Sequence, residues 1–423
     1  MDEGRGRRRQ SDIYRAGVLG RRPPVPTDAA ELERRARAKM SPRAWAYVAG
    51  GAGEGATMRH NREAFDRWRV VPRMLGGAVE RDLSTRVLGT ELSAPLLLAP
   101  VGAAGLVMPD SDVRIAEGAH AAGTPYVFSC QGCNPMEETA AAMGATPFWY
   151  QLYWSTDEGL VDSMIRRAEA AGAQALVVTL DTTMLGWRPQ DLNLGSLPFS
   201  RGVGIAQYTS DPRFTEVVRE RVAAASGPAE KVQVTLGAVR TLLSISREHP
   251  GRFLDNLRSR EPRTAVETFL SIYSNPALDW DHVATLRERT SLPVLLKGVL
   301  HPEDARRALD LVDGIIVSNH GGRQVDRSVA SLDALVAIRE AVGREPTVLL
   351  DSGVRTGADL LVALALGADA CLLGRPHVYG LALAGADGVR QVIDNLVAEL
   401  DLSMGLVGAR SLADLTPDLL LRP

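Results

Sequence analysis

The sequence predicts an α/β fold, a (β/α)8 TIM barrel with an N-terminal helical segment and a long insertion after strand 4. Eight short apolar runs are continuous rather than alternating, which is typical of strands buried on both faces of a parallel sheet. Alanine-rich amphipathic stretches lie between most of these runs. Strand–helix alternation repeated eight times indicates a closed barrel surrounded by helices.

The apolar runs give the expected strands in order along the chain. They lie at 95–102, 125–130, 148–153, 175–182, 292–299, 314–322, 347–353 and 370–376. Helices are expected between them, at 157–173, 302–312, 331–343 and 356–368 among others. The alternative is an open doubly wound sheet, which would carry a G-x-G-x-x-G turn after its first strand. The first turn, "APVGAAGLVMPD" (99–110), lacks that pattern, so the barrel is favoured.

Two segments fall outside the repeat. Residues 1–94 are predicted to be an N-terminal extension that packs on the barrel of residues 95–423, with a helix near 27–49. The basic run "RGRRR" (5–9) in this extension is expected to be solvated and disordered. Arg188 and Lys297 are 109 positions apart, far more than one strand–helix unit needs. The insertion at about 189–290 is predicted to be a lid over the C-terminal mouth, with an oligomer contact as the alternative.

Composition excludes several classes of function. The net charge of −3 gives no field that would attract nucleic acid or an anionic membrane. No apolar segment reaches the roughly 18–20 residues of a membrane span, and no secretory signal is recognisable, so a cytoplasmic protein is expected. Cys130 and Cys133 have C-x-x-C spacing, but no second pair completes a metal site, and no metal is expected.

Polar residues end most of the expected strands, and a barrel brings these ends to one mouth. Four of them are hydrogen-bonding groups suited to a flat polar heteroaromatic ligand: Ser129, Gln151, Thr179 and Ser318. Lys297 would place a cation inside the mouth, where it could stabilise an anion. "DSGVRTG" (351–357) and "LGRP" (373–376) end the last two strands, the usual phosphate site of such barrels. Gly353, Arg355 and Arg375 are the candidate phosphate contacts.

His320, in "SNHGGRQ" (318–324), follows the sixth strand and should face the same mouth as Asp181, which could hold and polarise its ring. Arg188 and Arg323 add two guanidinium groups, whose natural ligand is a small carboxylate. Tyr47 and Tyr153 could contribute hydroxyls. A base, carboxylate anchors, a cation and a phosphate cradle together indicate oxidation of a hydroxy acid with a phosphorylated flavin.

Six motifs in order, "YQLY", "TLDT" with "GWRP", "LLKGV", "SNHGGRQ", "DSGVRTGAD" and "LGRP", resemble the FMN-dependent α-hydroxy-acid oxidase and dehydrogenase family. The resemblance covers about residues 11–420. "YVAGGAG" (47–53), "LDTTMLGWRPQDL" (180–192), "YTSDPRF" (208–214) and the long insertion are most similar to its lactate 2-monooxygenase branch.

The resemblance implies a role for each matched residue. His320 would be the catalytic base, Asp181 its partner, and Lys297 the cation beside the flavin N1/O2 edge. The substrate carboxylate would bind to Arg188, Arg323, Tyr47 and Tyr153. FMN would bind to Pro100, Val101, Gly102, Ser129, Gln151, Thr179, Lys297, Ser318, Asp351, Gly353, Arg355, Gly374 and Arg375. A homo-oligomer, tetramer or octamer, is also implied.

The implied reaction is oxidation of a small L-2-hydroxy acid to the 2-oxo acid with O2 as acceptor, followed by decarboxylation in the manner of lactate 2-monooxygenase. An oxidase that releases H2O2, a dehydrogenase with another acceptor and a non-redox FMN isomerase stay open. Met108 stands where many relatives have histidine, a departure that the lactate 2-monooxygenases share. Gln131 stands where relatives often have a large apolar side chain near the substrate, and it points to a more polar substrate than lactate.

Overall fold

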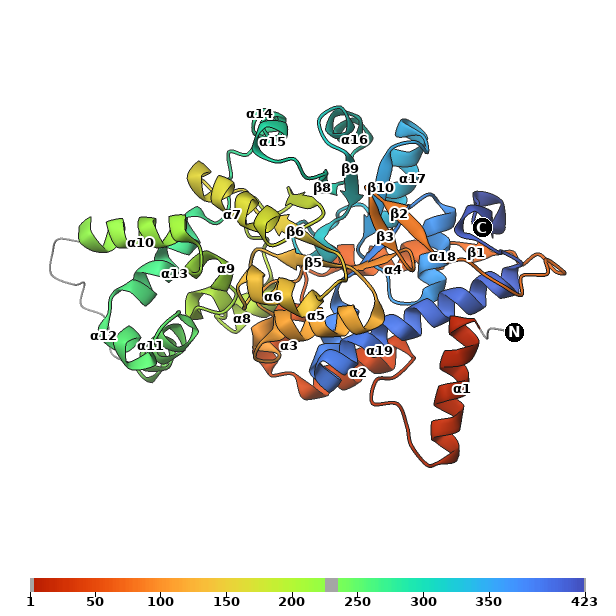
Figure 1. Ribbon diagram of the computed structural model, residues 1–423, viewed down its shortest axis with the longest axis horizontal. Coiled ribbons are helices and arrows are strands. Elements are labelled where there is room, and N and C mark those ends of the chain that lie inside the picture. The colour runs from red at the N-terminus through yellow and green to blue at the C-terminus, as the bar shows by residue number, and fades with distance from the viewer. Residues whose placement is uncertain (1–3, 225–234, 422–423) are drawn as a thin grey trace.

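The computed structural model describes residues 4–224 and 235–421, and its centre is a closed barrel of eight parallel strands (Figure 1). Going round the barrel, each strand pairs with the next along the chain, and β11 closes on β4. The strands are β4 (Leu96–Leu98), β5 (Tyr126–Ser129), β6 (Phe148–Leu152), β7 (Leu176–Thr179), β8 (Val294–Val299), β9 (Gly314–Val317), β10 (Thr347–Asp351) and β11 (Cys371–Leu373). Each predicted run contains one of them, so the predicted barrel is confirmed.

The strands are apolar throughout because both of their faces are buried. Leu97 belongs to a cluster of buried side chains that includes Val127, Val177 and Leu295, one or two from each strand. Its neighbours Leu96 and Leu98 belong instead to the larger cluster formed with the helices. Alternate residues therefore fill the barrel and cover its outside, as the two-residue period of a strand requires.

Helices alternate with the strands and cover the barrel. They are α5 (Ser111–Ala122), α6 (Met136–Met143), α7 (Glu158–Ala170), α16 (Pro302–Leu309), α17 (Ser331–Val342), α18 (Gly357–Ala365) and α19 (Arg375–Val407). The four expected helical stretches correspond to α7, α16, α17 and α18. The long α19 is interrupted at Ala384 and Gly385, and it packs against α5, α18 and the N-terminal helices.

The N-terminal segment contributes four helices and two small antiparallel pairings. The helices are α1 (Arg5–Val18), α2 (Ala29–Lys39), α3 (Pro42–Ala49) and α4 (Ala56–Asp66). The hairpin of β2 (Thr85–Val87) and β3 (Thr90–Leu92) closes one end of the barrel, where the Trp149 indole donates a hydrogen bond to the Thr90 hydroxyl (3.0 Å). The short β1 (Arg69–Val70) pairs with β12 (Leu420–Leu421).

The expectation of a disordered basic start is wrong, because the run at 5–9 begins helix α1. Gly6 allows α1 to lie close to α19: a Cβ there would fall 2.5 Å from the Leu402 side chain. The Gly6 N–H donates to the Asp401 carboxylate (2.7 Å), and the Arg9 guanidinium donates to Asn395 (2.9 Å). Part of the basic run at 5–9 therefore takes part in tertiary contacts, and these contacts cannot be predicted from the number of charges in the run.

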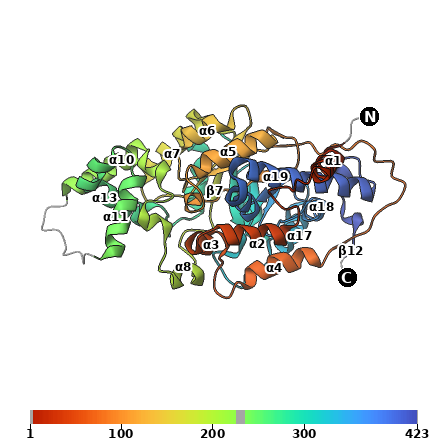
Figure 2. The same cartoon turned by 90° about the horizontal axis from the view of Figure 1, so that it is seen from below.

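The insertion runs from α8 (Pro189–Asn193) to the start of β8 and is largely helical. It contains α9 (Ala206–Thr209), α10 (Pro212–Ala224), α11 (Leu236–Glu248), α12 (Phe253–Arg258), α13 (Glu261–Ile272), α14 (Trp280–Ala284) and α15 (Leu286–Arg289). Helices α10 to α13, in green, gather at one end of the molecule in both views (Figures 1 and 2). The role of a lid stays a prediction.

Candidate active site

The C-terminal ends of the barrel strands surround a cavity; the space between its atoms, including the part open to solvent, is about 1010 Å³. Most of the predicted site residues line it: Tyr47, Pro100, Val101, Gly102, Tyr153, Thr179, Arg188, Lys297, His320, Arg323, Asp351, Gly353, Arg355, Gly374 and Arg375. The structure therefore brings together residues that are up to 328 positions apart in the sequence. Ser129, Asp181 and Ser318 are not in this lining but each contacts a residue of it, and Gln151 contacts Ser129.

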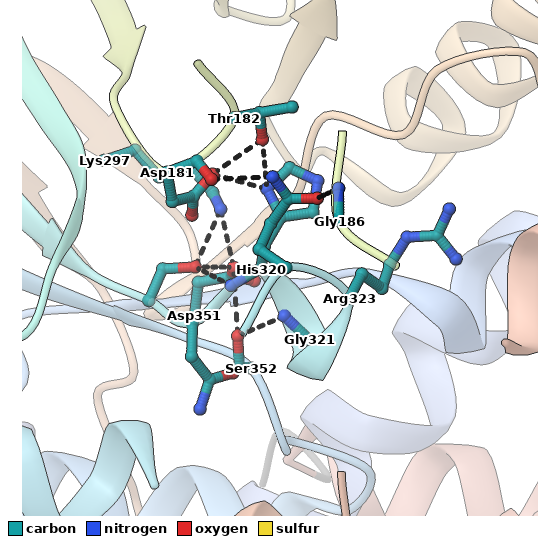
Figure 3. A network of polar contacts seen from close by, with 12 residues as sticks. Asp181, Thr182, Gly186, Lys297, His320, Gly321, Arg323, Asp351 and Ser352 are labelled. Atoms are coloured by element: carbon teal, nitrogen blue, oxygen red, sulfur yellow. Dashed lines mark hydrogen bonds and ion pairs between the residues drawn. The ribbon is translucent and has the colours of Figure 1, made fainter. Parts of the chain in front are cut away.

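His320 and Asp181 form a hydrogen-bonded pair at the mouth (Figure 3). The His320 Nδ1 lies 2.7 Å from the Asp181 Oδ1, and the Thr182 hydroxyl donates to that same oxygen (2.9 Å). Burial lowers the pKa of His320, and the charges of Lys297 and Arg188 add to this, against the opposing effect of Asp181. The ring is therefore neutral near pH 7, with Nδ1 engaged and Nε2 left to accept a proton.

Lys297, Ser318 and Asp351 form a second buried polar group beside this pair (Figure 3). The Lys297 ammonium lies 2.8 Å from the Asp351 carboxylate and also donates to the Ser318 hydroxyl (2.8 Å). The Ser318 hydroxyl in turn donates to Asp351 (2.6 Å). Burial would raise the pKa of Asp351, but the charge and hydrogen bond of Lys297, together with the hydrogen bond from Ser318, outweigh it and lower that pKa. Lys297 is therefore held as a fixed cation inside the barrel mouth.

Two arginines stand beside the base, and the site is short of negative charge to balance them. The Arg323 guanidinium lies over the ring of Tyr47, 4.9 Å from its centre, and donates to the backbone oxygens of Tyr47 and Gly50. Burial, together with the charge of Arg188, lowers the pKa of Arg323 to about 9. Such a shift marks a cation that lacks a counter-ion, and a carboxylate ligand would supply one.

The far end of the cavity has the features of a phosphate cradle. Gly353 has φ of +92°, and a Cβ there would lie 3.0 Å from the backbone oxygen of Asn61. A Cβ at Gly374 would meet no atom closer than 4.0 Å, so the backbone there is open to a ligand. Helix α19 begins at Arg375, next to Gly374, and directs its N-terminus to the same place. Arg355 supplies a second cation there.

At the ends of the barrel strands around the cavity, two buried polar atoms have no hydrogen-bond partner within the described residues. They are the Gln151 Nε2 and the Thr179 Oγ1, both at strand ends. The other end of the Gln151 amide accepts from the Cys130 backbone (3.2 Å) and the Ser129 hydroxyl (3.4 Å). A donor and a hydroxyl left unpaired at this depth fit a polar ring system, and with the phosphate cradle they fit FMN.

The N-terminal segment is joined directly to the loop that carries the base. Asn61 on α4 and Asn319 exchange two side-chain hydrogen bonds, of 2.8 and 2.7 Å. The Asn319 Oδ1 also accepts from the backbone of Gly322 (3.1 Å). His320 lies between Asn319 and Gly322 and has φ of +56°, a left-handed conformation. The hydrogen bonds of Asn319 to Asn61 and to Gly322 form a clamp that holds it in place.

Several residues at the site were not foreseen from the sequence. Thr182 contacts both members of the His320–Asp181 pair. The insertion contributes Phe199 and Tyr273 to the cavity lining. Thr182 could have been found by its place beside Asp181, whereas nothing in the pattern around Phe199 or Tyr273 marks them.

Neither cysteine of the C-x-x-C pair shows reactive chemistry. The Cys130 sulfur accepts from the Tyr153 backbone (3.4 Å), and burial raises the pKa of its thiol to about 11. The Cys133 sulfur accepts from the Gly105 backbone (3.2 Å), and burial raises its pKa further. Both thiols are therefore protonated and act as packing groups.

The chain matches known proteins along nearly its whole length. The model of the FMN-dependent dehydrogenase family matches residues 36–422. An FMN-dependent alpha-hydroxy acid dehydrogenase of Penicillium citrinum is 40% identical over 98% of this chain and 95% of its own. An L-lactate oxidase of Lysinibacillus sphaericus is 39% identical over 93% and 92%. A crystal structure of mandelate oxidase with (S)-4-hydroxymandelic acid has a TM-score of 0.75 at 33% identity, covering 94% of this chain and 98% of that one.

A second mandelate oxidase structure, of a Y128F mutant, contains a C4a-OH-FMN adduct; it has a TM-score of 0.73 at 33% identity and covers 91% and 97% of the two chains. No helix in the described ranges is long and apolar enough to cross a membrane. The extent of these matches identifies the chain as a member of the FMN-dependent dehydrogenase family, which uses FMN to oxidise alpha-hydroxy acids.

Proposed function

We propose that this enzyme oxidises a small L-2-hydroxy acid with O2 as the electron acceptor, and that the 2-oxo acid is decarboxylated before it leaves. The observation that carries the first step is the neutral imidazole of His320, held by Asp181 in one cavity with the buried Arg188 and the partly buried Arg323. A base next to an anion site suits a substrate whose hydroxyl and carboxylate are on adjacent atoms.

The substrate carboxylate would bind between Arg188 and Arg323, with the hydroxyls of Tyr47 and Tyr153 as further donors. Both tyrosines line the cavity, and burial raises the pKa of each, so both hydroxyls keep their protons. Two guanidinium groups fix the direction of a carboxylate as well as its place. This arrangement would bring the hydroxyl side of the substrate to His320.

His320 would take a proton from the substrate at Nε2, and Asp181 would stabilise the imidazolium that forms. FMN, when bound, supplies the acceptor for the two electrons. Lys297 would place its charge where negative charge then develops, while Gly353, Arg355, Gly374 and Arg375 hold the phosphate. The remaining proposed cofactor contacts are Pro100, Val101, Gly102, Ser129, Gln151, Thr179, Ser318 and Asp351.

The outcome in air depends on whether the 2-oxo acid stays in the closed site. If it stays, lactate and O2 give acetate, CO2 and water; if it leaves first, the products are pyruvate and H2O2. The insertion supports the first course, because its Phe199 and Tyr273 line the cavity and could delay release. The helical bulk of the insertion beside the mouth would serve the same purpose.

The test uses purified FMN-loaded enzyme and L-lactate. Anaerobic bleaching of the flavin would establish the oxidation step, and an unbleached flavin with every 2-hydroxy acid tried would contradict it and favour the non-redox isomerase. In air, acetate and CO2 in equal amounts support decarboxylation. Stoichiometric H2O2 without CO2 would identify an oxidase, and reduced flavin that persists in air would identify a dehydrogenase with another acceptor.

Gln131 supports a substrate with a polar side chain. It is 6% exposed and lines the cavity, and its side-chain amide has no hydrogen-bond partner within the described ranges. Its backbone is fixed at both ends, by the Ser129 hydroxyl (3.1 Å) and the Ala103 N–H (2.9 Å). We therefore expect L-glycerate to reduce the flavin with a higher kcat/KM than L-lactate, and the Gln131→Met variant to reverse that preference.

The cytoplasmic location and the tetramer or octamer stay predictions. Sedimentation of the FMN-loaded enzyme would measure its oligomeric state.

A further inference from the structure

We infer that Gln324 is the positioning residue of the active site: its side-chain amide holds the 181–188 loop, and with it both Arg188 and Asp181. The inference rests on the proposed function, in which Arg188 binds the substrate carboxylate and Asp181 supports the base. Gln324 lies four residues after His320, on the opposite side of the two glycines.

The Gln324 amide makes four hydrogen bonds, all to the 181–188 loop. Its Oε1 accepts from the Arg188 guanidinium (2.7 Å) and the Gly186 N–H (3.4 Å). Its Nε2 donates to the backbone oxygens of Asp181 (2.7 Å) and Met184 (2.9 Å). One neutral side chain is therefore bonded near both ends of the loop and in its middle.

Apart from Gln324, two residues from distant parts of the chain bond to the loop backbone: the Ser274 hydroxyl donates to the Thr183 oxygen (3.2 Å) and the Gly53 N–H to the Trp187 oxygen (2.9 Å). No helix or strand is formed between 181 and 188. Two of its three apolar side chains are largely exposed, Met184 at 69% and Trp187 at 72%, while Leu185 lines the cavity, so packing contributes little to its position. Where apolar burial is small, the hydrogen bonds of a loop determine its position.

The 181–188 loop lies close to the backbone of Arg323 and Gln324, and this close approach makes the contact with the Gln324 amide specific. A Cβ at Gly186 would lie 2.6 Å from the Arg323 oxygen and 2.7 Å from the Gln324 oxygen, so the backbones touch there. The Arg188 Nε also donates to the Arg323 oxygen (3.1 Å). Two acceptors thus orient Arg188 from one side, and within the described ranges no side chain pairs with its Nη1.

A neutral amide is the group that this position requires. Glutamine accepts from a cation and donates to two carbonyls at the same time. Glutamate would keep the contact with Arg188 but turn it into an ion pair, which competes with a substrate carboxylate, and it would have no donor for the two carbonyls. Methionine has a similar shape and would lose all four bonds.

The experiment measures ligand binding by the FMN-loaded Gln324→Met enzyme. The probe is 2-hydroxy-2-methylpropanoate, which keeps the carboxylate and hydroxyl but has no hydrogen on C2, so it cannot be oxidised. Its Kd is read from the change in flavin absorbance. We expect the Kd to rise at least tenfold and the KM for L-lactate to rise with it, and kcat for flavin reduction to fall more than about threefold because Asp181 also loses a support.

Gln174→Met is the matched control, because Gln174 makes one side-chain bond, to Thr90 at the other end of the barrel (2.9 Å). Its Kd should equal that of the unmodified enzyme. A Gln324→Met enzyme with normal FMN content and a Kd within twofold of the unmodified one would overturn the inference. If that variant does not fold, Gln324→Glu gives the same decision, since tight binding of the probe by it would contradict the need for a neutral amide. If the unmodified enzyme neither binds the probe nor is reduced by any 2-hydroxy acid, the proposed function fails instead.

Discussion

Gly298 on β8 lies directly against Asp181, so that a Cβ at position 298 would fall 2.8 Å from the Cβ of Asp181. Gly298 also has φ of +110°, a conformation that side chains rarely adopt. The place of the carboxylate that holds His320 therefore depends on the absence of a side chain on the neighbouring strand.

We expect Gly298→Ala to displace Asp181 and to lower kcat for flavin reduction at least tenfold, with a loss of about 1–3 kcal/mol in the free energy of unfolding. Stopped-flow reduction and urea unfolding measure the two effects. Gly172→Ala is the matched control, since Gly172 has φ of +91° but open space around its Cβ position. The control variant should be less stable but should keep its kcat. An equal loss of kcat in the control would show that displacement of Asp181 is not the cause.

Replacement of His320 should stop the reaction without releasing FMN. His320→Asn suits the left-handed backbone at this position, which asparagine tolerates better than most residues. Loss of the base should lower the rate of flavin reduction by about 10²–10⁴-fold. The bound FMN, measured by absorbance after gel filtration, should be unchanged. Near-normal reduction by this variant would show that another group takes the proton.

The pH dependence of kcat/KM should show an acid limb that begins below the usual range of histidine. Burial lowers the pKa of His320, so the active neutral form persists to lower pH than in an exposed histidine. Asp181 opposes this shift, so Asp181→Asn should move the acid limb to still lower pH while it lowers the plateau. Anaerobic flavin reduction between pH 4 and 9 measures both. A limb that moves to higher pH would contradict the assignment of the base.

Lys297 should matter for stability as well as for catalysis, because its removal leaves Asp351 buried without a cation. We expect Lys297→Met to lower the free energy of unfolding of the apoprotein by about 3 kcal/mol, measured with urea. The double variant Lys297→Met with Asp351→Asn should recover more than half of that loss, since it buries no charge. If the double variant is as unstable as the single one, the ion pair is not the cause.

The barrel could be predicted because each strand is buried on both faces and leaves a continuous apolar run in the sequence. Leu96, Leu97 and Leu98 show this in three residues. Helix α1 was missed for the opposite reason. Its contacts with Asp401 and Asn395 are nearly 400 positions away, and no local pattern reveals that a basic run has partners at such a distance.

The meeting of candidate residues at one mouth was predictable where residue type at a strand end signals chemistry, as for His320, Asp181 and Lys297, whose catalytic roles stay predictions. It was not predictable where the role depends on geometry. Phe199 lines the cavity only because part of the insertion reaches the mouth of the barrel. Gln324 was part of a recognised motif, but its four bonds to the 181–188 loop depend on how two loops meet.

The paired amides of Asn61 and Asn319 also set an order of events during synthesis. Asn61 is synthesised 258 residues before Asn319. Six barrel strands, β4 to β9, lie between them in the sequence, so the Asn61 amide has no Asn319 to bond to until all six have been synthesised. The clamp that holds the left-handed turn at His320 can form only when both ends of this long interval have met. A barrel begun at residue 95 would therefore lack half of the clamp, and anyone who transplants this site into another barrel needs to transfer the N-terminal helices with it.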